Sequence, residues 1–468
     1  GGGKGRERGL ALPGTRSLKK LRPIAKVGRP TPHRQRERPE MHLDDGRAVP
    51  DPTIPERFAW AHRQGHPRYV WPEVEPGAWT AACRSVEAAI AAGLAPDASG
   101  PPPHLDAHPD ALAVAAFTTG CGALLGRWLE IGRLSAPAPA REVLLRHLDY
   151  GRQRADRLSR VLERAAEAMA TEGVDVVLFK GGQTARTLFD EPALRPMADL
   201  DLLVRPAVLD RAEAALARAG FDLQIRQREP ERSTWAPPGS RPDLHSVHVP
   251  HPDNPLTVDL HASLARSYYG VGVVDPGLPG SEARAPLPDA PASVAGLEDA
   301  RLWVVLAAHA SEDLHNLQLV RLVELVLLGR SLERSGAWGT TSALARRAGS
   351  LHFLYPALGL THALAPDAVD PGLLAEARSA APARMVRVVA SLTPGTAQRL
   401  QGLALEERFM WARGPAEIAR RTAHMLVPAS AGGSPVALAR LYRARAYRLL
   451  RGRVRLRTDQ PDRTGAGS

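Results

Sequence analysis

Cysteine is almost absent from this chain. Its 468 residues include only Cys83 and Cys121, which lie far apart in the sequence. So few cysteines exclude a disulfide framework and a cysteine-rich metal site. A reducing compartment suits such a chain best, and we therefore expect a cytoplasmic protein.

Long hydrophobic runs are also missing. The least polar long stretch, Ala111 to Leu125, is too short to cross a bilayer and contains threonine and glycine, so we expect a buried helix there. The first forty residues contain no apolar segment that could form the core of a signal peptide. The sequence therefore predicts no membrane span.

Lysine is scarce in a chain that is rich in arginine. The only lysine beyond Lys26 is Lys180. A site that needs a compact ammonium close to phosphate oxygens would keep lysine where arginine supplies the general surface charge. Lys180 also precedes Gly181 and Gly182, where the backbone can turn tightly and come close to a ligand. We therefore interpret Lys180 as functional, with chance as the alternative.

The net charge of +11 is concentrated in the tails. Residues 1–40 carry a net charge of +9 and residues 436–468 carry +7, which leaves −5 for 41–435. Nucleic-acid-binding domains usually present a basic groove, so the acidic middle makes a nucleic-acid partner an unfavoured alternative. Met41 follows the first basic segment, which is either a true tail or an extension upstream of the native start.

One stretch organises the middle of the chain. An apolar run of strand length, Val176 to Phe179, ends at the Lys180 turn, and a helix-like segment follows. The next strand begins with Asp199-Leu200-Asp201. Residues two apart share a face of a strand, so both aspartates point one way while Leu200, Leu202 and Val204 point into a core.

A third carboxylate comes later. Residues 256–261 alternate as a strand does, with Val258 and Leu260 on one face and Asp259 and His261 on the other. Three carboxylates gathered on one face repel each other unless a cation lies between them. A pair of divalent metals is the usual solution in phosphoryl chemistry.

These segments together resemble the uncharacterised nucleotidyltransferase family (the type 5 group) of the DNA polymerase beta-like superfamily. The resemblance covers roughly Arg160 to Arg334. The matching segments, in order, are Lys180-Gly181, then Arg195-Pro196-Met197-Ala198-Asp199-Leu200-Asp201, then Asp259-Leu260-His261.

The resemblance implies an α+β fold, in which a small mixed sheet lies between helical regions, and a catalytic site on that sheet. Asp199, Asp201 and Asp259 would be catalytic and would bind two Mg²⁺ ions. The residues implied to bind a nucleoside triphosphate are Lys180, Gly181, Gly182 and Arg195. Most relatives in the superfamily have Gly-Ser at this turn, so the Gly-Gly here provides no serine hydroxyl.

The expected reaction moves a nucleoside monophosphate to a hydroxyl or phosphate of a small-molecule or peptide acceptor. Genes of the family commonly lie beside biosynthetic genes, which implies a tailoring role in natural-product or polysaccharide biosynthesis. Two alternatives stay open: an AbiEii-type toxin that modifies tRNA, which the Lys180-Gly181-Gly182 triplet favours, and a non-catalytic nucleotide- or partner-binding protein. Toxicity on expression would indicate the first, and nucleotide binding without pyrophosphate release the second.

The predicted organisation has five parts. They are a disordered basic tail over 1–40, a helical region over 41–160, the nucleotidyltransferase core over 161–275, a second helical region over 293–430, and a basic helix with a disordered end over 431–468.

Within these parts we expect helices, strands and one long loop. The expected helices are 77–94, 110–131, 141–171, 207–219 and 299–332. The expected strands are 221–225 and a hairpin of 244–250 with 256–261, and the expected loop covers 275–292.

Histidines offer weaker signals. At strand spacing His245 and His248 fall on opposite faces and no cysteine joins them, so we reject structural zinc. His309 and Glu324 resemble a histidine and an acid of the family only loosely, since the expected acid is aspartate.

Overall fold

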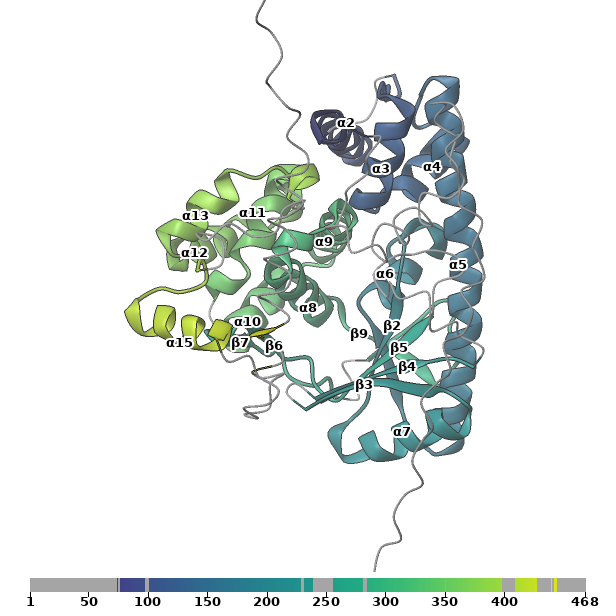
Figure 1. The fold of residues 1–468 in the computed structure, drawn as a ribbon, viewed down its shortest axis with the longest axis vertical. Coiled ribbons are helices and arrows are strands. Elements are labelled where there is room, and N and C mark those ends of the chain that lie inside the picture. The colour runs from purple at the N-terminus through teal and green to yellow at the C-terminus, as the bar shows by residue number, and fades with distance from the viewer. Residues whose placement is uncertain are drawn as a thin grey trace, which may run out of the picture. The chain divides into compact units, whose positions relative to one another are not determined.

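The computed structural model describes residues 74, 76–96, 101–228, 231–238, 256–280, 284–349, 351–397, 409–426, 439 and 442–443. Contacts divide the chain into two units, Gly1–Arg47 and Ala48–Ser468, and every described residue lies in the second unit. The described part contains thirteen α-helices and a mixed seven-stranded sheet, which confirms the α+β fold (Figure 1). The segments 1–40 and nearly all of 431–468 lie outside it.

Four helices precede the sheet. They are α2 (Pro76–Leu94), α3 (Pro109–Thr119), α4 (Gly122–Glu130) and α5 (Ala138–Thr171). The single helix predicted over 110–131 is two helices, because Gly120 adopts a φ of 71° that ends α3. The long helix α5 ends before Gly173, as the sequence predicted, and packs against α3, α4 and α7.

The apolar stretch 111–125 is buried. Every residue of α3 from Ala111 to Thr119 is shielded from solvent. Among the described residues, no single helix is long and apolar enough to span a membrane, and α3 and α4 pass such a test only as a pair that bends by 114°.

The main sheet has the strand order β3-β4-β5-β2-β1-β9-β8. The pairs β2–β5 and β1–β9 are parallel, and the other neighbours are antiparallel. The strands are β1 (Val176–Phe179), β2 (Asp199–Leu203), β3 (Asp222–Arg228), β4 (Glu231–Ala236), β5 (Thr257–His261), β8 (Arg284–Pro286) and β9 (Val294–Leu297). Between them lie α6 (Gly181–Thr187), α7 (Leu209–Arg218) and the ribbon of β6 (Arg266–Tyr268) with β7 (Gly272–Val274).

One local prediction differs from the structure, and a second falls on residues that the structure does not describe. The loop predicted over 275–292 contains β8, and with β9 it carries the sheet beyond residue 275. These short strands form because β9 pairs with β1, which is far away in the sequence. Their Pro- and Gly-rich surroundings show no strand pattern, so the sequence did not predict them. The segment 244–250, predicted to pair with β5, lies outside the described residues, and the described neighbours of β5 are β4 and β2.

The sheet separates two hydrophobic cores. On one face Leu200, Leu202 and Val204 join Val258 and Leu260 in a cluster that includes residues of α5 and α7, as the alternation predicted. The opposite face bears the three aspartates. There Val177, Phe179 and Leu203 belong to the larger core, which also contains residues of the helices before and after the sheet.

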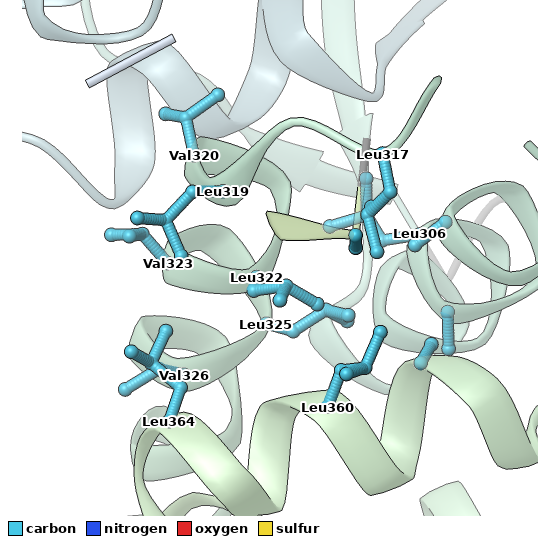
Figure 2. Packing of buried hydrophobic residues seen from close by; sticks show 14 of the residues in the cluster. Leu306, Leu317, Leu319, Val320, Leu322, Val323, Leu325, Val326, Leu360 and Leu364 are labelled. Carbon is cyan, nitrogen blue, oxygen red and sulfur yellow. The ribbon is translucent and has the colours of Figure 1, made fainter. Parts of the chain in front are cut away.

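The helices after the sheet are α8 (Asp299–Glu312), α9 (Leu319–Arg334), α10 (Trp338–Ala348), α11 (Tyr355–Leu364), α12 (Pro371–Ala380), α13 (Ala383–Ala390) and α15 (Pro415–Leu426). The helical stretch predicted over 299–332 forms two helices, α8 and α9, which are separated by the 3-10 turn Leu314–Asn316. Side chains of α9 lie between α8 and α11 (Figure 2), and apolar residues cover more than one face of α9, which explains its central place in the core.

Candidate active site

The paired strands β2 and β5 bring Asp201 and Asp259 together. Asp201 pairs with Phe179 at the end of β1 and, on its other side, with Asp259 of β5. Because β2 and β5 are parallel and in register, Asp201 and Asp259 are direct neighbours on one face. Ligand atoms of Asp201, Asp259 and His261 all lie within 4.8 Å of one another.

Asp201 has two close polar partners, Lys180 and His261. Its Oδ1 lies 2.5 Å from Nζ of Lys180 and 2.9 Å from Nε2 of His261. A carboxylate only accepts hydrogen bonds, so Nε2 of His261 carries the proton. Burial raises the pKa of Asp201, but Lys180 and His261 outweigh this effect and hold the pKa below its ordinary value. Asp201 is therefore ionised.

Asp259 is held from the adjacent strand β4. The hydroxyl of Thr234 donates to its Oδ1 at 2.6 Å, and Nη1 of Arg232 lies 3.2 Å from its Oδ2. Thr234 is directly opposite Asp259 in the β4–β5 ladder, so strand pairing alone brings the two side chains together. Both oxygens of Asp259 thus have a fixed orientation.

Asp199 differs electrostatically from its neighbour. Burial, together with the negative charges of Asp201 and Asp259, raises its pKa to about 7. The loop that precedes Asp199 is fixed by Arg154 of α5, which donates to the carbonyl oxygens of Met197 at 2.5 Å and Ala198 at 2.7 Å. The site therefore contains more negative charge than its own cations neutralise.

The turn after β1 has the positive φ on the lysine and not on the glycines. Lys180 has a φ of 50° and a ψ of −135°, a conformation that a residue with a side chain adopts rarely and that is often found at functional sites. The glycines serve close packing instead. A Cβ on Gly182 would lie 2.5 Å from Leu178, and one on Gly181 would lie 3.0 Å from the guanidinium of Arg195.

Arg195 lies against Gly181 and donates hydrogen bonds from three of its nitrogen atoms. Its Nε and Nη2 donate to the two carboxylate oxygens of Glu324 at 2.9 and 3.0 Å, and its Nη1 donates to the carbonyl of Pro196 at 2.6 Å. Thr184 of α6 donates to the same carboxylate. Glu324, which corresponds only loosely to the acid of the family, is thus the residue of α9 that binds Arg195.

Gln183 connects α6 to the far part of the sheet. Its side-chain amide donates to the carbonyl of Leu297 at 2.7 Å and accepts from the N–H of the same residue at 3.0 Å. These two hydrogen bonds fix the helix that follows Lys180 against β9.

A cavity of about 320 Å³ opens beside Lys180 and His261. Its polar lining comes from β4, the β5–β6 segment and α8, and includes Arg232, Arg266, His309 and Glu312. A cavity of this volume, next to a cluster of carboxylates, is large enough for part of a small substrate.

The donor set fits a hard divalent cation. The group whose ligand atoms lie close together consists of Asp201, Asp259 and His261, and Asp199 is not part of it. Its two carboxylates supply oxygen ligands, which Mg²⁺ and Mn²⁺ prefer. The raised pKa of Asp199 reflects a negative charge that such a cation would compensate. Lys180 and Arg232 provide part of that compensation here.

The model of a family described as uncharacterised nucleotidyltransferases matches residues 106–366, more than half of the chain. The chain belongs to this family. Searches among curated proteins and among solved structures gave no match. Family membership supports a general nucleotidyl-transfer function, which is that of a transferase.

Several contributors to the site were not found from the sequence. Thr234, Arg232 and Arg154 had no motif to mark them, because each reaches the aspartates or their loop through long-range pairing or packing. If β4 had been predicted as the neighbour of β5, Thr234 would have been placed opposite Asp259. His261, which the strand alternation placed on the same face as Asp259, makes a hydrogen bond to Asp201.

Proposed function

We propose that this nucleotidyltransferase moves a nucleoside monophosphate from a nucleoside triphosphate to a hydroxyl or phosphate of a small-molecule or peptide acceptor. The observation that carries the proposal is the register that brings Asp201 beside Asp259, with Asp199 two residues away on the same strand. Membership of the family adds independent support.

Asp199, Asp201 and Asp259 would hold two Mg²⁺ ions. When bound, these ions would supply positive charge to the phosphate oxygens. In the reaction the acceptor oxygen forms a bond to the α-phosphorus, the bond from that phosphorus to the bridging oxygen of the β-phosphate breaks, and pyrophosphate leaves. Asp259, oriented by Thr234 and Arg232, would take the proton of an acceptor hydroxyl.

The triphosphate would be bound on the Lys180 side. The ammonium of Lys180 is already within reach of Asp201, at 2.5 Å, so a phosphate bound to the same cluster would be within its reach as well. Gly181 and Gly182 would support this region by close packing against Arg195 and Leu178, and Arg195 would support it through Glu324.

The charge distribution supports a small acceptor. Residues 41–435 carry a net charge of −5, which does not suit a long polyanion as acceptor. A tailoring step in biosynthesis agrees with such an acceptor. The free thiols of Cys83 and Cys121 agree with a cytoplasmic location.

The test is label transfer. The purified protein would be incubated with each labelled nucleoside triphosphate and Mg²⁺, with and without host extract, and pyrophosphate release and label transfer would be followed. Asp201→Asn and Asp259→Asn should each reduce the rate by about a thousandfold, since metal-bound charge stabilisation is worth several kcal/mol. Asp175→Asn is the matched control, because the side chain of Asp175 is 79% exposed and lies outside the cluster.

Removal of metal with EDTA should stop both pyrophosphate release and label transfer, and added Mg²⁺ should restore them. Nucleotide binding without pyrophosphate release in the wild-type protein would instead support a non-catalytic role. The absence of binding would contradict the proposal as a whole.

A further inference from the structure

The cavity beside the carboxylates has a basic wall. Three cations from separate elements line it: Lys180 after β1, Arg232 on β4 and Arg266 on β6. Among the lining residues that the structure describes, Glu312 is the one acid. A cavity with this lining suits an anionic ligand.

Each of the three cations contacts a carboxylate. Lys180 lies 2.5 Å from Asp201, Arg232 lies 3.2 Å from Asp259, and Arg266 donates to Glu312 at 2.5 and 3.0 Å. The Nε of Arg232 is buried and has no hydrogen-bond partner in the described part of the chain. Two of these three pairs therefore involve the carboxylates proposed to bind metal.

The other basic side of the site has little space. Arg195 is bound by Glu324, whose side chain is fully buried, and the cavity that Arg195 lines measures about 40 Å³. Gly181 packs directly on the Arg195 guanidinium. A triphosphate therefore finds room on the side of Lys180 and Arg232, and not on the side of Arg195.

We infer that the triphosphate of the nucleotide binds in the cavity of about 320 Å³, on the wall formed by Lys180, Arg232 and Arg266. This inference rests on the function proposed above. Once Asp201 and Asp259 are neutralised, Lys180 and Arg232 can turn from these carboxylates to phosphate oxygens, for which the planar guanidinium of arginine is well shaped. Arg232 is thus a phosphate-binding residue that no sequence motif marked.

The experiment measures binding and not turnover. Isothermal titration calorimetry of the full chain with Mg²⁺ would use two probes, inorganic tripolyphosphate and each common nucleoside triphosphate. Arg232→Gln should weaken both probes by about tenfold to a hundredfold, the value of one charged hydrogen bond. Arg232→Lys, which keeps the charge, should lose less affinity.

A second variant tests the far end of the wall. Arg266→Gln/Glu312→Gln removes a cation together with its partner, so that no charge is left unpaired, and should also weaken both probes by about tenfold. Arg226→Gln is the matched control. Arg226 lies on the neighbouring strand β3, is paired with Glu213 of α7, and does not line the cavity. Circular dichroism of every variant would confirm that it folds.

The outcomes separate this inference from the proposed function. The inference is overturned, and the proposed function stays intact, if the Arg232 and Arg266/Glu312 variants fold and bind both probes as tightly as the Arg226→Gln control does. A wild-type protein that binds neither probe would overturn both.

Discussion

The most deeply buried charge near the site is the carboxylate of Glu324. It is shielded completely from solvent and faces Arg195 with two hydrogen bonds, while Thr184 donates to it from α6. The attraction of Glu324 keeps the pKa of Arg195 above its ordinary value although burial opposes this. This one side chain therefore joins the helix after Lys180, the loop before Asp199 and the helix α9.

Removal of this carboxylate should be costly. Glu324→Gln is expected to lower the free energy of unfolding by about 3 kcal/mol, because it leaves the buried Arg195 guanidinium without a counter-charge. Urea unfolding would measure the loss. The double variant Arg195→Met/Glu324→Leu should be more stable than Glu324→Gln, since it leaves no buried charge behind. Equal stability of wild type and Glu324→Gln would show that the pair contributes nothing.

Residue-scale features were only partly predictable from the sequence. Strand alternation was sufficient to place Asp199 and Asp201 on one face of their strand, because a period of two follows from backbone geometry alone. The position of Asp259 beside Asp201 depends on the pairing of β2 with β5. The partners of these carboxylates were not predictable. Thr234 is 25 residues from Asp259, and Glu324 is 129 residues from Arg195, so only the tertiary fold brings them together.

At the scale of elements, short segments are held by contacts that their own sequence does not reveal. The 3-10 turn Leu351–Phe353 is an example. His352 in this turn is fully buried, and its Nε2 lies 3.3 Å from the carbonyl oxygen of Trp411, in the segment before α15. Burial, and next the charge of Arg413, lower the pKa of His352 to about 4.

This turn should make the fold sensitive to acid. The ordinary pKa of histidine is 6.5, so between about pH 4 and pH 6.5 the unfolded chain binds a proton at His352 that the folded chain does not, and stability falls as the pH falls. Between pH 7 and pH 5 this group should account for about 2 kcal/mol of lost stability. Urea unfolding of wild type and His352→Gln at both pH values would measure it. The prediction fails if the two proteins lose the same stability.

Elements with a strong local pattern were predicted well, and those that depend on a partner were not. Helices α2, α5 and α7 have apolar periodicity and lie where we expected them; Pro96 follows the end of α2, and a glycine follows the ends of α5 and α7. Strands β8 and β9 have three and four residues and form by pairing with each other and with β1. No local pattern could indicate such strands.

For the molecule as a whole, the larger core extends across two of the predicted boundaries, at residue 160 and between residues 275 and 293. Val177, Phe179 and Leu203 of the sheet belong to one cluster with residues of α2 to α4 and of α8 to α13. The segments 41–160, 161–275 and 293–430, which the sequence suggested as separate regions, thus share one hydrophobic interior. We propose that they fold together and not as independent domains.

A fragment test follows from this shared core. The fragment 161–275 lacks β8, β9 and all the helices that cover the aspartate face, so it should show no cooperative thermal transition by circular dichroism. The fragment Ala48–Ser468 contains the whole second unit, and we expect it to melt in one transition. A cooperative transition of 161–275 would establish it as an independent domain.

The pairing of β1 with β9 has a consequence for synthesis on the ribosome. When His261 has left the exit tunnel, every residue proposed to hold metal has been made. At that moment β1 still lacks its neighbour on one edge, Gln183 lacks the Leu297 backbone, and Arg195 lacks Glu324. The nascent chain therefore carries its full set of carboxylates well before it can fix their geometry, and the site matures only after α9 has emerged.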